Sequence, residues 1–439
     1  MTGYCVSDIA AITGGVLSGD GAALVTGVVI DSRAVTPGAL FAAIPGERVD
    51  GHDYIGKAFD LGAACCLAQR VPAGETRPVI CVPDTAAALE TFARAYRARF
   101  SIPVLGVTGS VGKTTAKEMV ASVLSQRWNT LKTEKNFNNQ LGVPLTLFRL
   151  GPEHEAAVVE MGVSRFGDMA PLAAMVQPTA MLFTIIGHAH LEFLRDRRGV
   201  LQEKTSVLDT MPDDAVAFCN GDDDLLRAMT CRQRKVTFGL SAGCDVRAVD
   251  VRDLGDEGST CTIIAGTRRI PVRISAYGQH MVYAALEGAA VGIEYGLTDD
   301  EIIRGIAAYQ PVGSRARVVR TARYTVIDDC YNANPDSTAA ALRSMATLPA
   351  GRRVAILGNM GELGANADAL HRETGVCAAK AGVSLVITCG ELARQIAAGA
   401  AAEDPAVATA SFDTLDALLP ALPVLLQPGD CVLVKASHS

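Results

Sequence analysis

Short apolar runs separated by turns characterise the first hundred residues of the chain. They predict short strands, over residues 25–30, 39–44, 63–68 and 79–82. Apolar positions at helical spacing then predict a helix over residues 86–100. We therefore expect a small α/β domain over residues 1–100.

From Ser101-Ile102-Pro103, which we interpret as a hinge, apolar runs of strand length alternate with helical patterns. The predicted strands cover residues 104–108, 156–160, 181–186, 215–219 and 236–238. A strand-rich stretch over residues 244–274 then leads into a helix that starts near His280. Alternation of this kind is typical of a mostly parallel sheet. We expect this central domain to span residues 101–312.

The segment Pro311-Val312-Gly313-Ser314 indicates a second linker. Beyond it, strands are predicted over residues 325–328, 353–357, 385–388 and 431–434, again interleaved with helical patterns. The alanine-rich residues 397–402 are interpreted as the end of a helix. A second Rossmann-like sheet is therefore expected over residues 313–439.

Composition and charge narrow the class of protein. The 439 residues are 49% hydrophobic and 20% charged, which indicates a globular chain of about three domains. A net charge of −7 gives no basic footprint, so no nucleic-acid partner is expected. We expect neither a signal peptide nor a membrane span. Twelve scattered cysteines without a C-x2-C pair favour reduced thiols and a cytoplasmic location.

A glycine-rich segment between the first central strand and a helix is typical of a phosphate-binding loop. It reads Thr108-Gly109-Ser110-Val111-Gly112-Lys113-Thr114-Thr115. Glycines let backbone N–H groups turn toward an anion, and the helix N-terminus adds its positive end. Lys113 is expected to reach the β- and γ-phosphates, and Thr114 or Thr115 to ligate Mg²⁺. Gly106 lies one residue too far upstream for the strict G-x4-GK[ST] spacing, but we favour a nucleoside triphosphate site over a plain turn.

Three polar residues follow the predicted central strands, and ligands bind beyond the carboxyl ends of such strands. Glu160 ends a strand beside the phosphate loop, where its carboxylate suits Mg²⁺, although a solvated or capping glutamate is the alternative. His190 lies in Gly187-His188-Ala189-His190, where a hydrogen-bonded loop histidine is the ordinary interpretation. Lys204 opens a helical pattern with Val207 and Leu208, where an exposed lysine would be ordinary.

In combination, these residues resemble the Mur ligase family along nearly the whole chain. The shared order is the phosphate loop, Glu160-Met161-Gly162, His190, Lys204, Gly278-x-His280, Arg315 and Asp328-Asp329. Within the family, the resemblance is to the member that joins D-alanyl-D-alanine to UDP-N-acetylmuramoyl-tripeptide. Three segments carry it: Asn136-Phe137-Asn138-Asn139, Tyr331-Asn332-Ala333-Asn334-Pro335-Asp336-Ser337, and Leu357-Gly358-x-Met360-x-Glu362-Leu363-Gly364 with His371.

The N-terminal segment Asp31-Ser32-Arg33 resembles the UDP-sugar-binding domain that this member shares with a diamino-acid-adding sibling. Ser32 and Arg33 are therefore expected to contact the UDP-linked substrate. The sibling carries Asp-Asn-Pro-Arg in its last domain, and this chain has no such tetrapeptide. Its absence argues against the diamino-acid-adding activity.

The resemblance implies a ligase in which ATP phosphorylates a carboxylate and an amine then attacks the acyl phosphate. It implies two Mg²⁺ ions, one served by Thr114 and Glu160 and the other by His190, and a Lys204 that is carbamylated by CO₂. It also implies nucleotide contacts from the phosphate loop, His280, Arg315 and Asp328 or Asp329. Substrate contacts are expected from Asn138, Asn139, Asn332, Asn334 and Ser337. We expect a monomer.

Four departures from the family pattern keep alternatives open. Met281 and Ala284 replace asparagines, the first of which approaches adenine in the family, and Asn359 replaces a common aspartate. The chain also stops where the family continues into another helix, so we expect a truncated C-terminus. The alternatives are another carboxylate–amine ligase of the family and a nucleotide-binding module without ligase activity.

Overall fold

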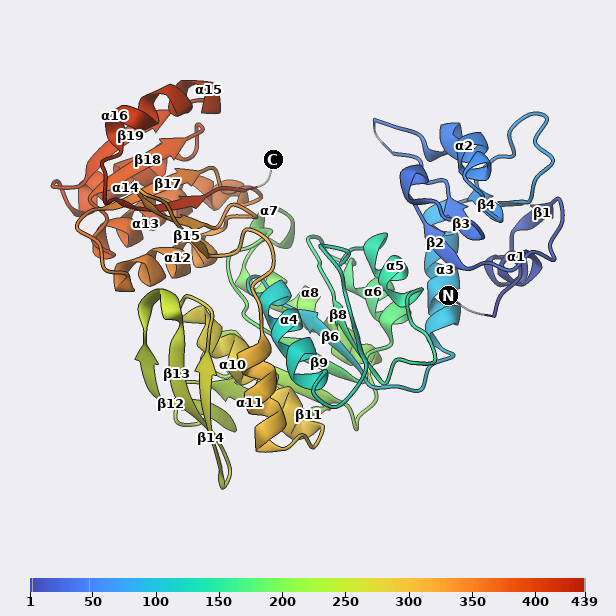
Figure 1. Cartoon of the computed structure of the whole chain (residues 1–439), viewed down its shortest axis with the longest axis horizontal. Helices are drawn as coiled ribbons and strands as arrows, with labels where there is room; N and C mark the ends of the chain where they lie inside the picture. The colour runs from blue at the N-terminus through green and yellow to red at the C-terminus, as the bar shows by residue number, and fades with distance from the viewer. Residues whose placement is uncertain (2, 47, 438–439) are drawn as a thin grey trace.

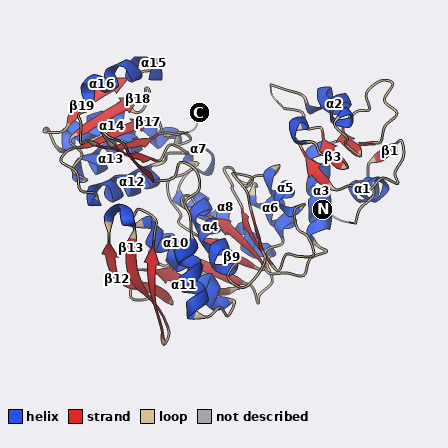
Figure 2. Cartoon of the chain, viewed as in Figure 1, coloured by secondary structure: helices blue, strands red, loops and turns tan. Residues whose placement is uncertain are grey.

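The chain folds as three α/β units in a row. The computed structural model describes residues 1, 3–46 and 48–437. The last two residues of the chain, where we expect the truncation, lie outside the described part. Within these ranges the strands form three sheets, each covered by helices (Figure 1, Figure 2). The expected α/β class with mostly parallel sheets is confirmed.

The N-terminal unit contains a five-stranded sheet in the order β1-β5-β4-β3-β2. Its strands are parallel except that β1 runs antiparallel to β5. The elements, with 3₁₀ helices labelled η, are α1 (Val6–Thr13), β1 (Val16–Ser18), β2 (Gly27–Val29), η1 (Ser32–Ala34), β3 (Ala39–Ala42), η2 (Gly51–Tyr54), α2 (Ile55–Asp60), β4 (Cys65–Ala68), β5 (Val79–Cys81) and α3 (Thr85–Arg97).

Helix α3 joins the N-terminal unit to the central unit. Its Asp84 N-cap accepts hydrogen bonds from the first turn, and its apolar face carries Phe92 and Tyr96, both fully buried. The Tyr96 hydroxyl donates to the carbonyl of Leu150 at 2.6 Å, and the Phe92 ring lies 4.8 Å from that of Phe148. The first unit is therefore fixed to the central unit by packing and hydrogen bonding.

The central unit contains a nine-stranded sheet in the order β14-β13-β12-β11-β10-β9-β6-β8-β7. Strands β12 to β14 are antiparallel and the others are parallel. The elements are β6 (Val104–Thr108), α4 (Lys113–Leu124), β7 (Thr130–Lys132), α5 (Gly142–Leu147), β8 (Ala156–Glu160), α6 (Met169–Val176), β9 (Ala180–Phe183), α7 (Leu191–Leu194), α8 (Arg197–Thr205), η3 (Ser206–Thr210), β10 (Val216–Asn220), α9 (Asp224–Ala228), β11 (Arg234–Gly239), β12 (Val246–Asp253), η4 (Gly255–Glu257), β13 (Ser259–Ala265), β14 (Arg268–Ile274), α10 (His280–Glu294) and α11 (Asp299–Ala308).

Strand β6 lies between β8 and β9, so the chain leaves it in one direction and returns on its other side. Ligands of open α/β sheets bind beyond the carboxyl ends of strands at such a switch point. The phosphate-binding loop follows β6, and α4 after it packs closely against α10. Glycines permit the approach, because a Cβ on Gly288 would lie 3.0 Å from Val123 and 3.1 Å from Met119.

The C-terminal unit contains a six-stranded sheet in the order β15-β16-β20-β17-β18-β19. It is parallel except that β15 pairs antiparallel with β16. The elements are β15 (Arg317–Arg320), β16 (Thr325–Asp328), α12 (Pro335–Thr347), β17 (Arg353–Gly358), η5 (Gly364–Asn366), α13 (Ala367–Lys380), β18 (Leu385–Cys389), α14 (Arg394–Glu403), β19 (Ala408–Phe412), α15 (Leu415–Leu418), η6 (Leu419–Ala421), α16 (Leu422–Leu425) and β20 (Cys431–Lys435).

The helices and cysteines show two further features. In the described part of the chain, no helix combines the length and the apolar character needed to cross a bilayer. All twelve cysteines are free thiols, as expected from their spacing. Burial raises the pKa of the Cys65 thiol to about 12, so this group is unreactive at neutral pH.

Candidate active site

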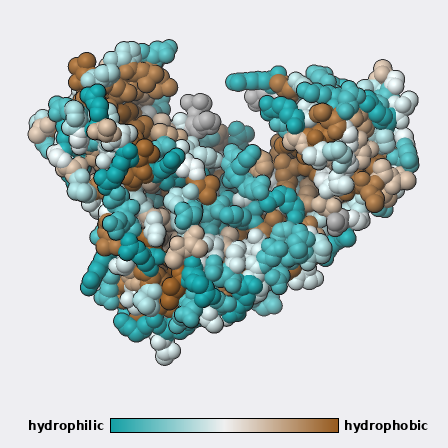
Figure 3. Space-filling model, in the orientation of Figure 1, coloured by the Kyte–Doolittle hydropathy of each residue, from teal (hydrophilic) through white to brown (hydrophobic). Residues whose placement is uncertain are grey.

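A cavity of about 720 Å³ lies between the central and C-terminal units. The central unit contributes the phosphate-binding loop, the ends of β8 and β10 and the start of α10. The C-terminal unit contributes the segment between β16 and α12, and the side of α12. The described residues of the N-terminal unit add nothing to this lining. Figure 3 shows a wide notch between the N-terminal and C-terminal units above the central one.

The phosphate-binding loop has the backbone that its glycines predict. Gly112 has a φ of +86° at the N-cap of α4, and Gly109 has a φ of +151°. A Cβ on Gly109 would lie 1.9 Å from the Thr184 hydroxyl, so only glycine fits there. No side chain caps the start of α4, which leaves its first N–H groups free for an anion. Lys113 donates from Nζ to the carbonyl of Gly109 at 2.8 Å.

Several other predicted nucleotide residues lie around this loop. The Ser110 hydroxyl accepts a hydrogen bond from the N–H of Gly187 at 2.9 Å, and Thr115 lines the cavity. Thr108, by contrast, is fully buried outside the cavity, and its hydroxyl has no partner among the described residues. The loop therefore presents backbone and Lys113 to the cavity, while Thr108 belongs to the strand beneath it.

Glu160 and Thr114 meet beside the loop, as a Mg²⁺ site requires. The Thr114 hydroxyl donates to Oε2 of Glu160 at 3.0 Å, and Asn138 donates from Nδ2 to Oε1 at 2.8 Å. Asn138, predicted as a substrate residue, thus holds the Glu160 carboxylate. No group of three or more His, Cys, Asp or Glu side chains in the described chain is placed to hold a metal. Mg²⁺ needs few ligands from the protein, because it retains several waters and binds the nucleotide phosphates.

Lys117, which sequence reasoning missed, lies behind this carboxylate. It is fully buried, and its Nζ donates to the carbonyl of Thr133 at 2.7 Å. The same Nζ lies 3.2 Å from Glu118 and 3.7 Å from Glu160. A lysine one turn after Lys113, ahead of the mostly apolar second half of α4, was the available signal.

Lys204 is buried, so the ordinary alternative of an exposed lysine does not hold, and its predicted place at the start of a helix is wrong. It lies near the end of α8, is 0% exposed, and its Nζ has no partner among the described residues. Burial, reinforced by the charge of Lys113, holds the pKa of Lys204 well below its ordinary range. This shift favours the uncharged amine of Lys204.

His190 caps α7 in the left-handed conformation, with a φ of +60°. Its Nδ1 lies 2.5 Å from Oε2 of Glu362, which belongs to the C-terminal unit and was not predicted as a site residue. Burial lowers the pKa of His190, and the charges of Lys204 and Lys113 lower it further. A neutral imidazole with one nitrogen paired has its second nitrogen available as a metal ligand.

Several predicted nucleotide residues face the loop from the other side of the cavity. The Arg315 guanidinium stacks 4.1 Å from the centroid of the Tyr331 ring and lines the cavity. Asp329 also lines it, and its Oδ2 lies 2.6 Å from Nζ of Lys435. Asp328 does not line it, so of the two predicted alternatives the structure favours Asp329. His280 lines the cavity at the start of α10, where burial lowers its pKa.

The predicted amine-side residues line the cavity, but their side chains also support local structure. Asn334 caps α12 by accepting from the N–H of Ser337 at 2.8 Å, and the Ser337 hydroxyl accepts from the N–H of Asn334. Asn332 accepts from the N–H of Ala333 at 2.8 Å. Asn139 likewise accepts from Gly142 at the start of α5. The Ser337 hydroxyl also donates to the carbonyl of Asn334 at 3.1 Å.

Ser32 and Arg33 lie in η1 of the N-terminal unit, outside the cavity. Arg33 is 2.7 Å from Asp31, and this partner lowers the pKa of Asp31 to about 2. Ser32 and Arg33, the predicted substrate contacts, therefore belong to the unit that lies across the notch from the C-terminal unit.

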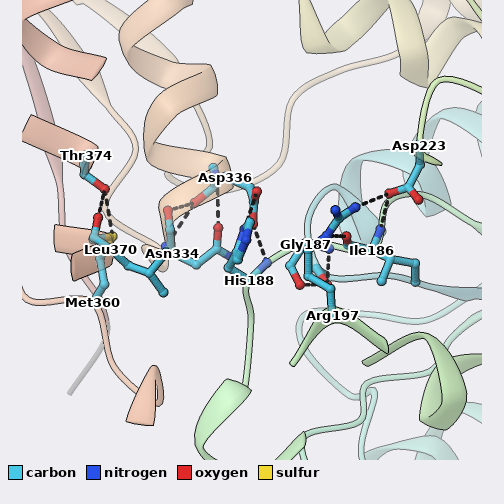
Figure 4. Close-up of polar contacts among 12 residues, drawn as sticks. Ile186, Gly187, His188, Arg197, Asp223, Asn334, Asp336, Met360, Leu370 and Thr374 are labelled. Carbon is cyan, nitrogen blue, oxygen red and sulfur yellow. Dashed lines mark hydrogen bonds and ion pairs between the residues drawn. The ribbon is translucent and has the colours of Figure 1, made fainter. Parts of the chain in front are cut away.

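A contact between His188 and Asp336 links the central and C-terminal units (Figure 4). Asp336 accepts from the backbone N–H of His188 at 2.5 Å, and its other oxygen lies 3.1 Å from Nδ1 of His188. Asp336 raises the pKa of His188 and so favours its charged form. Nearby, His371 accepts from the N–H of Met360 at 3.0 Å and so holds the segment that carries Glu362.

The departures from the family pattern have distinct places. Met281 is buried in α10, and Ala284 lines the cavity. Asn359 lies outside the cavity, where its Oδ1 accepts from the N–H of Ala393 at 2.8 Å. An amide at position 359 therefore serves local structure in the C-terminal unit.

Sequence comparison assigns the chain to a family over nearly its whole length. Family models match residues 24–97 (Mur ligase family, catalytic domain), 107–292 (Mur ligase middle domain) and 314–438 (Mur ligase, glutamate ligase domain). The UDP-N-acetylmuramoyl-tripeptide–D-alanyl-D-alanine ligase of Bacillus subtilis is 34% identical over 422 residues, 94% of this chain and 91% of that protein. The Escherichia coli enzyme of the same name is 34% identical over 445 residues, 100% of this chain and 96% of that protein.

The chain belongs to the Mur ligase family. As a member, it is an ATP-dependent ligase. Solved Mur ligase structures agree in fold. MurF from Acinetobacter baumannii superposes with a TM-score of 0.89 at 27% identity, covering 99% of this chain and 96% of that one. MurF ligase from Thermotoga maritima in complex with ADP gives 0.80 at 27% identity, covering 94% of each chain.

This Mur ligase therefore brings together most of the predicted site residues. Lys113, Thr114, Glu160 and His190 share one cavity with Arg315 and Asp329, and Lys204 lies buried beside them. Sequence reasoning missed Glu362 and Lys117 as site residues. The contact of Glu362 with His190 joins segments 172 residues apart, which the sequence does not show.

Proposed function

We propose that this Mur ligase joins D-alanyl-D-alanine to UDP-N-acetylmuramoyl-tripeptide, with ATP converted to ADP and phosphate. The observation that carries the proposal is the cavity, which faces a phosphate-binding loop and Glu160 toward Asn332, Asn334 and Ser337. Relatives 34% identical over nearly the whole chain carry the name of this activity. The reaction belongs to the synthesis of peptidoglycan precursors.

The first step transfers the γ-phosphoryl group of ATP to the free carboxylate of the tripeptide and releases ADP. Two like charges approach each other in this step. Lys113 and Arg315, from opposite sides of the cavity, offset their repulsion. Thr114 and Glu160 would hold one Mg²⁺, and the free nitrogen of His190 a second, which would supply further positive charge at the phosphates.

The second step is attack of the dipeptide amine on the acyl phosphate. The amine forms the new C–N bond, phosphate leaves with the electron pair of the broken C–O bond, and the amine loses a proton. Neutral amides and hydroxyls of Asn332, Asn334 and Ser337 would position the dipeptide. Because the cavity lies between two units, their closure excludes water that would hydrolyse the acyl phosphate.

We also propose that Lys204 reacts with CO₂ to form a carbamate. An uncharged amine is the nucleophile that this reaction needs, and burial favours that form of Lys204. The amine adds to carbon and releases one proton, which converts Nζ into part of an anionic oxygen donor. A carbamate would satisfy the unpartnered Nζ and would favour a nearby cation, whereas an ammonium would repel it.

The three sheets support domain limits near residues 100 and 312. We also propose that the enzyme is a monomer. The need for ATP supports a cytoplasmic location.

The test is a phosphate-release assay with ATP, UDP-N-acetylmuramoyl-tripeptide and D-alanyl-D-alanine. Release that requires all three substrates supports the proposal. If no amine leads to phosphate release, the proposal is contradicted and a nucleotide-binding module is favoured. If a diamino acid is the only amine that leads to phosphate release, the sibling ligase is favoured.

A further inference from the structure

One arm of the cavity, defined here as the part lined by α10, lies between that helix and α12. The residues of α10 that line it are His280, Tyr283, Ala284 and Glu287, whose spacing places them on one helix face. The opposite wall is the side of α12, with Arg343 and Ser344. Because α10 packs on α4, whose N-terminus would hold the phosphates, the nucleoside of a bound nucleotide can extend into this arm.

Glu287 is a buried carboxyl in this arm without a partner. It is 4% exposed and lines the cavity, and no hydrogen bond or ion pair joins it to another described residue. Burial alone raises its pKa well above the ordinary range, which favours the protonated carboxyl. A buried polar group without a partner is costly, and a ligand that pairs with it recovers that cost.

One neighbouring polar group of α10, the Tyr283 hydroxyl, is already paired. The Tyr283 hydroxyl donates to Oδ2 of Asp222 at 2.9 Å. Asp222 also accepts from the N–H groups of Leu240 and Ser241. Ala284 next to Glu287 adds an apolar surface. The arm thus combines an apolar wall with an unsatisfied polar group, as small-molecule pockets do.

We propose that the Glu287 carboxyl hydrogen-bonds the edge of the nucleobase of the bound ATP and makes this ligase prefer adenine over a purine without the amino group. A protonated carboxyl offers one O–H donor beside one carbonyl acceptor. Adenine presents the complement, a ring nitrogen beside an amino N–H. The inference rests on the proposed use of ATP at this cavity.

The test measures direct binding to the full chain of ADP and of the diphosphate of unsubstituted purine riboside, with Mg²⁺. In the wild type we expect ADP to bind about tenfold or more tightly than the analogue, as expected for a buried hydrogen-bonding group left unpaired. Glu287→Leu keeps the volume and removes the polar atoms, and it should abolish this preference by weakening ADP alone. Glu287→Gln keeps a donor and an acceptor, and it should retain the preference.

Pyrophosphate binding is the control, because the phosphate loop recognises it without a base. Equal weakening of ADP and the analogue in Glu287→Leu, or an unchanged preference, would overturn the inference. Nucleotide binding does not require turnover. A chain that binds ADP with this preference but forms no amide would contradict the proposed function and leave the role of Glu287 intact.

Discussion

Two lysines at the same site have different surroundings, and their chemistry follows from that difference. Lys113 is half-buried and bonded to the carbonyl of Gly109, and the charge of Glu160 opposes the effect of burial on its pKa. Lys204 is fully buried without a partner. Lys113 is therefore suited to stabilise, as a cation, the charge on the transferring phosphoryl group. Lys204 is suited to act as a nucleophile toward CO₂.

Replacement of Lys113 tests the first role. Lys113→Ala should lower turnover by about a thousandfold or more, because no other side chain of the loop can stabilise charge on the transferring phosphoryl group. The measurement is the rate of phosphate release. The exposed Lys380→Ala, which removes a surface pair with Glu403, is the matched control and should remain active. Near-normal turnover in Lys113→Ala would show that ATP binds elsewhere.

Replacement of Lys204 tests the carbamate. Lys204→Ala should be inactive and partly rescued by millimolar formate or acetate, which supply the missing anionic oxygen. The wild type should also show a carbamate signal in ¹³C NMR after addition of labelled bicarbonate, and the variant should lack it. Full activity of Lys204→Ala without additive, or a dead variant that no acid rescues, would remove the support for this role.

At the scale of elements, the start of α12 combines a helix cap with a binding surface. Asn334 accepts the hydrogen bond that begins the helix and lines the cavity at the same time. Capping and substrate binding make different predictions for two variants, because aspartate caps a helix as well as asparagine does.

Asn334→Ala should destabilise the protein by about 1 kcal/mol through loss of the cap. Asn334→Asp should retain stability but raise the KM for D-alanyl-D-alanine, because a new negative charge would face the dipeptide carboxylate. Thermal unfolding and steady-state kinetics separate the two effects. An unchanged KM in Asn334→Asp would mean that Asn334 only caps the helix.

The sequence was sufficient for the interior strands and insufficient for four of the six strands at the sheet edges. Strands β1, β7, β15 and β19 were not predicted, and each lies at the edge of its sheet. An edge strand pairs on one side only and needs little apolar sequence. In β7, for example, only Leu131 is buried.

The site shows the same limit at the level of contacts. The loop and Glu160 follow strand ends and could be placed from the sequence. The burial of Lys204 could not, because α8 has a polar sequence and its depth depends on the loop that Glu203 holds through the N–H groups of Gly167 and Met169.

At the scale of the whole molecule, the central and C-terminal units are joined around the cavity, while the N-terminal unit is separated from the C-terminal one by the notch (Figure 3). In the His188–Asp336 contact, Asp336 also lines the cavity. We therefore expect it to stabilise the arrangement in which ATP and the amine-side residues meet.

A double-mutant cycle tests this contact. His188→Ala and Asp336→Ala should each lower kcat/KM for ATP several-fold, and the double variant should show a coupling energy of about 1 kcal/mol. Arg320→Ala removes an exposed pair with Asp256, also between these units, and should have little effect. Additive effects of the two cavity variants would contradict a direct role for the contact.

The central claim is that this chain adds a dipeptide. Neutral partners at Asn332, Asn334 and Ser337 suit an amide and a carboxylate together, and they reject amines that leave them unpaired. The most direct test supplies ATP and the UDP-tripeptide with equal concentrations of D-alanyl-D-alanine, D-alanine, L-lysine and diaminopimelate, and identifies the products by mass. We predict a dominant product that carries one added D-alanyl-D-alanine, and a dominant product with one added diamino acid would contradict the account.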